Sequence, residues 1–99
     1  MVEHTEVIEE VLLQDHLDDI DTGEPAVLIV YNDEINTFEW VIDTFVEILQ
    51  HTQEQSEQLA YLIHFKGKAT VKTAPKSVLR PLRTALVDRG LNAVVEDLV

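Results

Sequence analysis

A continuous apolar run, PAVLIVY at residues 25–31, is the feature that most restricts how this chain can fold. The run is rich in β-branched residues and has no polar alternation, which is typical of a central strand buried on both faces. Pro25 suits the first position of such a strand, where a missing N–H is tolerated. The rest of the chain must therefore be arranged around this strand.

Two helical patterns follow. Residues 36–50 carry apolar side chains at helical spacing, and Asn36 stands where it can begin a capping box. Thr52 and Gln55 repeat the capping-box spacing before a second apolar series. Gly67 suits the left-handed residue that ends a helix. These signals predict two consecutive helices with a very short connection.

The last third of the chain predicts a strand, a helix and a strand. ATVKTA at residues 69–74 alternates weakly, and LNAVVEDL at 91–98 is the closing strand. The helix between them starts at Ser77 or nearer Pro75, and Pro81 is expected only within about its first turn. The order strand, helix, helix, strand, helix, strand predicts an α+β two-layer sandwich with three helices on one face of a three-stranded antiparallel sheet.

Charge divides the 99 residues into two parts. Residues 1–24 carry nine acidic residues and no basic one, so we expect an acidic flexible arm before a core domain at residues 25–99. All seven basic residues lie within residues 66–99, although the net charge of the chain is −12. This basic third faces either an acidic partner or the acidic part of its own chain, and the sequence leaves both possibilities open.

Composition argues against several classes of protein. The chain has no cysteine, no apolar stretch of about 20 residues and no basic region typical of a signal peptide, so a soluble cytoplasmic protein is expected. Its acidic charge argues against binding to nucleic acid or anionic membranes. Glycine-rich phosphate loops and histidines at metal-ligand spacing are missing, so no metal or cofactor is expected.

Catalysis has little support in the sequence. Asp33, Glu34 and His64 are of the right type for acid–base chemistry, but no enzyme motif includes them. Such residues are common on protein surfaces. We therefore expect a protein that is not an enzyme.

A binding site is suggested by two polar features taken together. Asn32 and Asp33 end the first strand, and His64 lies near the end of the second helix. Each has an ordinary structural explanation on its own, as a turn residue or a partly buried histidine. If the fold brings them together, they offer three acceptors to an ammonium group, which is a donor only. Beside an apolar cavity, such a site predicts capture of a peptide N-terminus with a bulky first side chain.

Two segments, VLIVYNDEINTFEWVID and LIHFKGKA, resemble the ClpS family of Clp protease adaptors, and the resemblance extends over residues 26–99. It implies a fold similar to the C-terminal domain of the ribosomal stalk protein. It further implies a monomeric adaptor that presents proteins with N-terminal Leu, Phe, Trp or Tyr to a ClpA- or ClpC-type AAA+ unfoldase, which residues 1–24 would engage.

The resemblance also implies roles for individual residues. Asn32, Asp33 and His64 match the positions that bind the substrate α-amine. The positions that line the side-chain pocket match Ile35, Thr37, Phe38, Val41, Ala60, Ile63 and Val94.

The chain departs from the family pattern around the pocket. Glu34 replaces the second Asp of Asn-Asp-Asp, and Asn36-Thr37-Phe38 stands where Thr-Pro-Met is usual. Without the proline, either Asn36 or Thr37 must cap the helix. Ala60 occupies a position where Met is common. We expect Phe38 to narrow the pocket and Ala60 to widen it, so the preference among the four N-terminal residues stays open.

An alternative function has the same fold. The chain would dock on an unfoldase or another acidic partner through its basic third, without recognising N-terminal residues. The loss of the Thr-Pro-Met pattern favours this alternative.

Overall fold

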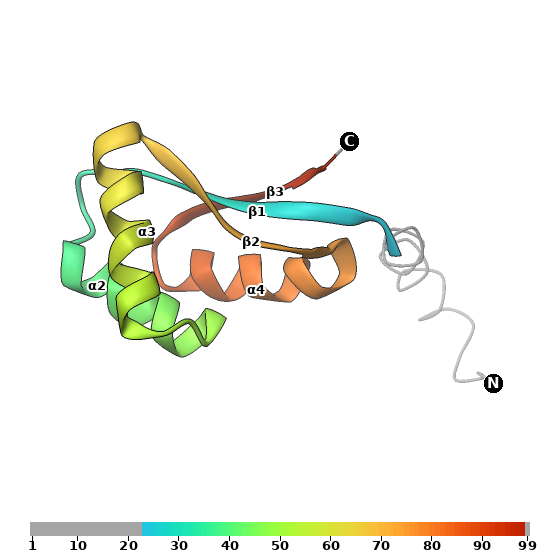
Figure 1. Ribbon diagram of the computed structural model, residues 1–99, viewed down its shortest axis with the longest axis horizontal. Helices are drawn as coiled ribbons and strands as arrows, with labels where there is room; N and C mark the ends of the chain where they lie inside the picture. Colours follow the sequence, from blue (N-terminus) through green and yellow to red (C-terminus); the bar gives the residue numbers. More distant parts are fainter. Residues whose placement is uncertain (1–22, 99) are drawn as a thin grey trace.

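The computed structural model describes residues 23–98, so the predicted arm lies outside the described residues except for Gly23 and Glu24. Its three-stranded sheet has the order β2-β1-β3 (Figure 1). The central strand β1 (Pro25–Tyr31) is antiparallel to both β2 (Lys68–Pro75) and β3 (Asn92–Asp97). The predicted α+β fold and the central position of the first strand are confirmed.

The helices lie on one side of this sheet. They are α2 (Phe38–Thr44), which continues into the π-helix η2 (Phe45–Leu49), α3 (Gln53–Lys66) and α4 (Lys76–Asp88). Figure 1 shows α4 running along the sheet, while α2, η2 and α3 pack together at one end of it. No helix within residues 23–98 is long and apolar enough to cross a membrane.

The burial of β1 follows from this one-sided cover. Leu28 and Val30 point toward the helices and are almost fully buried in the core. Ile29, on the opposite face, is buried as well, but Val27 and Tyr31 are only half-buried. Burial on both faces, predicted for the whole run, is therefore found only in its middle.

The first helix begins later than residues 36–50 suggest. Thr37, not Asn36, is the N-cap, because its Oγ1 accepts a hydrogen bond from the Trp40 N–H at 3.0 Å. The helix ends at Gln50, which has a φ of 62° and so is a left-handed residue without being glycine. Apart from its start at Phe38, the helical segment has the extent that the sequence predicts.

Helix α4 contains a proline at an unexpected place. It begins at Lys76 with Pro75 at the N-cap, so Ser77 lies inside the helix and does not cap it. Pro81 is then the sixth helical residue, beyond the first turn in which it was expected. Pro81 has no backbone N–H to donate to the carbonyl of Ser77, four residues earlier. The helix tolerates this loss because Pro81 and Ser77 are both exposed to solvent.

Two ion pairs involve the basic third of the chain. Arg89 pairs with Glu47 at 2.8 Å, and Lys76 pairs with Asp97 at 2.7 Å. Part of the basic charge therefore faces acidic residues of its own chain, one of the two possibilities that the sequence left open.

Two buried hydroxyls provide a test of the core. Thr44 and Ser56 are fully buried, and neither hydroxyl has a hydrogen-bond partner among the described residues. We expect Thr44→Val to raise the free energy of unfolding by about 1 kcal/mol, because it removes an unpaired buried polar group at nearly constant volume. Urea denaturation at neutral pH measures the change.

The matched control is Thr52→Val. The Thr52 Oγ1 caps α3 by accepting a hydrogen bond from the Gln55 N–H at 3.0 Å, so its loss should lower the free energy of unfolding by about 1 kcal/mol. Equal effects of the two threonine substitutions would contradict this assignment of the buried and capping hydroxyls.

Candidate functional site

The loop between β1 and α2 is organised by the carboxylate of Asp33. Its Oδ1 accepts hydrogen bonds from the backbone N–H groups of Ile35 and Asn36, both at 2.8 Å. Its Oδ2 accepts a third hydrogen bond, from the side-chain amide of Asn36 at 2.8 Å. A carboxylate has roughly four lone-pair sites, so one remains available. Asp33 therefore shapes the loop and keeps limited capacity for a ligand.

Asn36 and Trp40 anchor this loop to the end of α4. The Asn36 Nδ2 donates to the Gly90 carbonyl at 2.9 Å, and the Trp40 Nε1 donates to the Arg89 carbonyl at 2.9 Å. The Arg89 guanidinium lies 5.8 Å from the centre of the Trp40 ring. Because its side chain is committed to Asp33 and Gly90, Asn36 serves as a bridge instead of a helix cap.

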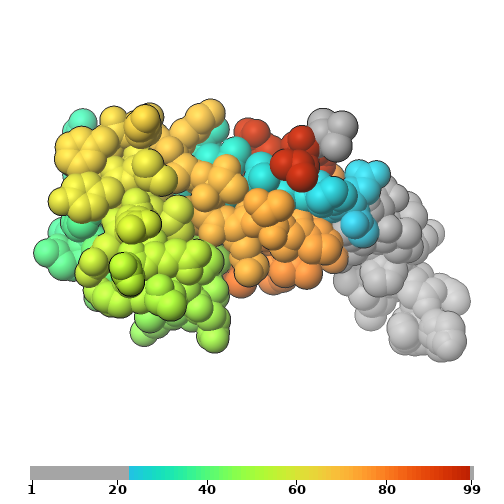
Figure 2. Space-filling model, viewed as in Figure 1, coloured from blue at the N-terminus to red at the C-terminus, as the bar shows by residue number. Residues whose placement is uncertain are grey.

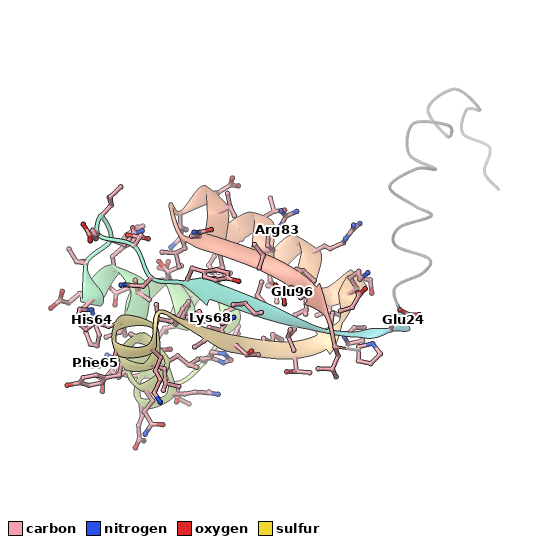
Figure 3. All side chains as sticks on the ribbon, turned by 90° about the horizontal axis from the view of Figure 1, so that it is seen from above. Glu24, His64, Phe65, Lys68, Arg83 and Glu96 are labelled. Atoms are coloured by element: carbon pink, nitrogen blue, oxygen red, sulfur yellow. The ribbon has the colours of Figure 1, made fainter. Side chains whose placement is uncertain are left out.

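Asn32 is held against the end of α3. Its backbone N–H donates to the Gly67 carbonyl at 2.9 Å. Gly67 has a φ of 94°, and its own N–H donates to the Ile63 carbonyl, so it ends α3 as predicted. Because His64 lies in the last turn of α3, this hydrogen bond brings the loop that follows β1 to the same end of the molecule as His64 (Figure 3).

A pocket of about 530 Å³ lies between the loop, α2 and α3. It brings together most of the residues that the sequence singled out, namely Asn32, Asp33, Phe38, Val41, Ala60, Ile63 and His64. Glu34 and Asn36 line it as well. The sequence places Glu34 in the polar cluster that follows the first strand and Asn36 at the start of the next helix, but it predicts neither as a residue of the pocket.

Three residues expected in the side-chain pocket, Ile35, Thr37 and Val94, are not among the residues that line it. Ile35 is 88% exposed at the tip of the loop. The Thr37 hydroxyl is used as the cap of α2. Val94 lines a separate cavity of about 290 Å³ beside basic residues of α4. The walls of the pocket therefore come from the loop, α2 and α3, and not from β3.

Asn32 and His64 offer free polar atoms to this pocket. Within residues 23–98, neither side chain has a hydrogen-bond partner. The His64 ring meets Phe38 and Phe65 nearly at right angles, with ring centroids 6.4 Å and 4.7 Å apart. The aromatic contacts position the imidazole without using its nitrogens.

The charge of Asp33 completes the polar end of the pocket. Partial burial acts to raise its pKa, but hydrogen bonds from Asn36 and Ile35 outweigh burial and hold the pKa below the ordinary value of 3.8. Asp33 is therefore a carboxylate at neutral pH. Together with the amide oxygen of Asn32 and a ring nitrogen of His64, it makes this end of the pocket suitable for a cation that only donates hydrogen bonds. Among the described residues, no acidic or histidine cluster is arranged to hold a metal ion.

The role of Asp33 in the loop predicts a pH-dependent stability. Its folded pKa lies below the unfolded one, so the stabilisation is present above the unfolded pKa and is lost as the pH falls through the folded pKa. Asp33→Asn should therefore lower the free energy of unfolding at about pH 7, and by a smaller amount at about pH 3. Urea denaturation of both chains at the two pH values measures this.

Glu34→Gln is the matched control for that experiment. Glu34 is the adjacent acid, and no hydrogen bond within residues 23–98 involves its carboxylate. It should have little effect at either pH. An Asp33→Asn effect that is equally large at both pH values would mean that the charge of the carboxylate does not support the loop.

Comparison with known proteins gives consistent matches. A family model described as "ATP-dependent Clp protease adaptor protein ClpS" matches residues 21–93. A protein of Neisseria meningitidis serogroup A, serotype 4A, described as ATP-dependent Clp protease adapter protein ClpS, is 27% identical over 89 residues. That match covers 82% of this chain and 86% of the relative.

A solved structure agrees with the fold. The structure of Agrobacterium tumefaciens ClpS2 bound to L-phenylalaninamide is similar with a TM-score of 0.73. The match covers 76% of this chain and 98% of that one, at 15% sequence identity. At this identity the likeness establishes the shared fold.

Proposed function

Because this chain belongs to the ClpS family of adaptor proteins for the ATP-dependent Clp protease, we propose that it binds hydrophobic N-terminal residues and delivers the proteins that carry them to a Clp unfoldase. The family consists of adaptors and not of enzymes. One observation carries the proposal: acceptors from Asn32, Asp33 and His64 lie in the same pocket as an apolar lining.

The polar end of the pocket is proposed to hold the substrate α-ammonium. An ammonium has three N–H donors and no acceptor. The Asn32 side-chain oxygen, the remaining lone pair of Asp33 and a nitrogen of neutral His64 match these donors in number. Hydrogen bonds to a charged group are stronger than those between neutral groups, and Asp33 also supplies the opposite charge.

The apolar end is proposed to hold the first side chain. Phe38 stands at the rim, while Ala60 and Ile63 are almost fully buried. Burial of one large side chain contributes about 2–3 kcal/mol. Phenylalaninamide, the ligand of the similar Agrobacterium protein, combines a free α-amine with a benzyl side chain, which is the chemistry proposed for this pocket.

The proposal also covers the partner. Residues 25–99 form the binding core, and residues 1–24 engage an unfoldase of the ClpA or ClpC type. The protein acts as a cytoplasmic monomer on substrates with N-terminal Leu, Phe, Trp or Tyr.

Binding should depend on a free α-amine. We expect peptides that begin with Leu, Phe, Trp or Tyr to bind at least tenfold more tightly than their N-acetylated forms, because acetylation removes the charge and two donors. His64→Ala should reduce this difference. Fluorescence anisotropy with labelled peptides measures both.

His51→Ala is the control, because the His51 Nε2 lies 2.8 Å from the Val71 carbonyl, away from the pocket. Equal affinity for free and acetylated peptides would refute the proposed amine site. Retained capture of an unfoldase in that case would favour the alternative of docking without N-terminal recognition.

Ala60 should determine how large a first side chain the pocket accepts. We expect Ala60→Met to weaken binding of Trp- and Phe-initiated peptides by roughly tenfold, with a smaller effect on Leu, because the longer side chain fills part of the pocket. Ala85→Met on α4 is the control. An unchanged order of affinities would mean that the first side chain does not lie beside Ala60.

A further inference from the structure

Helix α3 is apolar on two faces. Its inner face, which includes Ala60 and Ile63, is buried. Its outer face carries Tyr61, Leu62 and Phe65, which are 56%, 45% and 70% exposed. A helix in a small globular protein normally has one apolar stripe, and an exposed apolar patch of this kind marks an interaction surface. We call these three residues the aromatic ridge.

The aromatic ridge has a defined shape. The rings of Tyr61 and Phe65 are stacked, with centroids 5.4 Å apart and planes inclined by 15°. With Leu62, Gln58 and Lys66 they line a shallow cavity of about 360 Å³. Figure 2 shows α3 forming the outer surface at this end of the molecule, and Figure 3 shows Phe65 projecting from it. The ridge is therefore open to a ligand.

The ridge is continuous with the pocket. Phe38, at the pocket rim, meets the edge of Tyr61 with ring centroids 5.3 Å apart. His64, which also lines the pocket, meets Phe65 at 4.7 Å. Two residues of the pocket thus pack directly against two residues of the ridge.

We propose that the aromatic ridge is a second subsite that receives an apolar or aromatic side chain at the second or third residue of the captured peptide. The inference rests on the proposed function. With the α-amine at Asn32, Asp33 and His64 and the first side chain inside the pocket, the peptide has to leave across the rim. One residue spans at most about 3.3–3.6 Å, so the next residues come within reach of Tyr61 and Phe65.

Charge favours a peptide over a second copy of this chain as the occupant. Two copies with a net charge of −12 each repel one another. A peptide with a free N-terminus carries positive charge where Asp33 and Glu34 line the adjoining pocket. The ridge is therefore expected to bind a later part of the same peptide whose ammonium group lies in the pocket.

Peptides that differ only after their first residue test this subsite. Fluorescence anisotropy compares Leu-initiated peptides with Phe at the second or third position against the same peptide with Ser at both. We expect the Phe peptides to bind roughly tenfold more tightly, because part of one aromatic side chain is buried. Phe65→Ser should reduce this preference to less than about threefold, and Phe65→Leu should give an intermediate value.

Val87→Ser is the matched control. Val87 is 45% exposed on α4, outside the ridge, so the substitution removes a comparable apolar surface elsewhere and should leave the preference unchanged. Circular dichroism confirms that each variant is folded.

Three results would overturn the proposal, and they differ from failure of the proposed function. The first is Leu-dependent binding with no preference for Phe at the following positions. The second is that Phe65→Ser changes the oligomeric state seen by sedimentation but leaves the peptide preference intact. The third is that Phe65→Ser abolishes unfoldase capture but leaves the peptide preference intact. These would assign the ridge to a second copy or to the unfoldase. If no peptide with a free N-terminus binds, the proposed function itself fails.

Discussion

The hydrogen bond from the Asn32 N–H to the Gly67 carbonyl, 2.9 Å long, joins the end of β1 to the end of α3. It continues the antiparallel pairing of β1 and β2, in which Tyr31 lies opposite Lys68. The geometry of the pocket depends on this strand register, because the register sets the distance between the acceptors of the loop and His64. A shift of one residue would turn the side chains of β1 to the opposite face and separate the two halves of the site.

Asp33 combines a structural role in the loop with the binding role that we propose for it. Three hydrogen bonds to Ile35 and Asn36 use most of its acceptor capacity for the loop itself. Its negative charge nevertheless stays at the mouth of the pocket, where Asn32 and His64 have free polar atoms. The loop is thus stabilised by the same carboxylate that we propose holds the α-ammonium, so binding as proposed would need little rearrangement.

Phe38 connects the pocket with the outer surface of α3. It is 36% exposed, begins α2 and meets both Tyr61 and His64 edge to face. A flexible methionine at this rim would adapt to a ligand, whereas the Phe38 ring is held by its aromatic neighbours. The rim is therefore stiff, and Ala60, which also lines the pocket, leaves space that a bulkier residue would take.

Local chemistry was sufficient for much of the fold. The extent of β1, the Thr52 cap and the end of α3 at Gly67 all follow from side-chain type and spacing over a few residues. The start of α2 did not follow, because Asn36 and Thr37 are both good caps. Gly90, 54 residues away, decides between them by engaging the Asn36 amide.

The candidate site divides in the same way. The sequence by itself determined which residues are acceptors and which are apolar, and it placed Asn32 and Asp33 at a strand end and His64 near a helix end. Only the tertiary structure decided that these lie around one pocket, that Val94 lines a different cavity, and that Tyr61 and Phe65 continue the pocket rim. Spacing along a chain encodes contacts within a helix or turn, whereas contacts between elements depend on how the sheet pairs and how the helices pack against it.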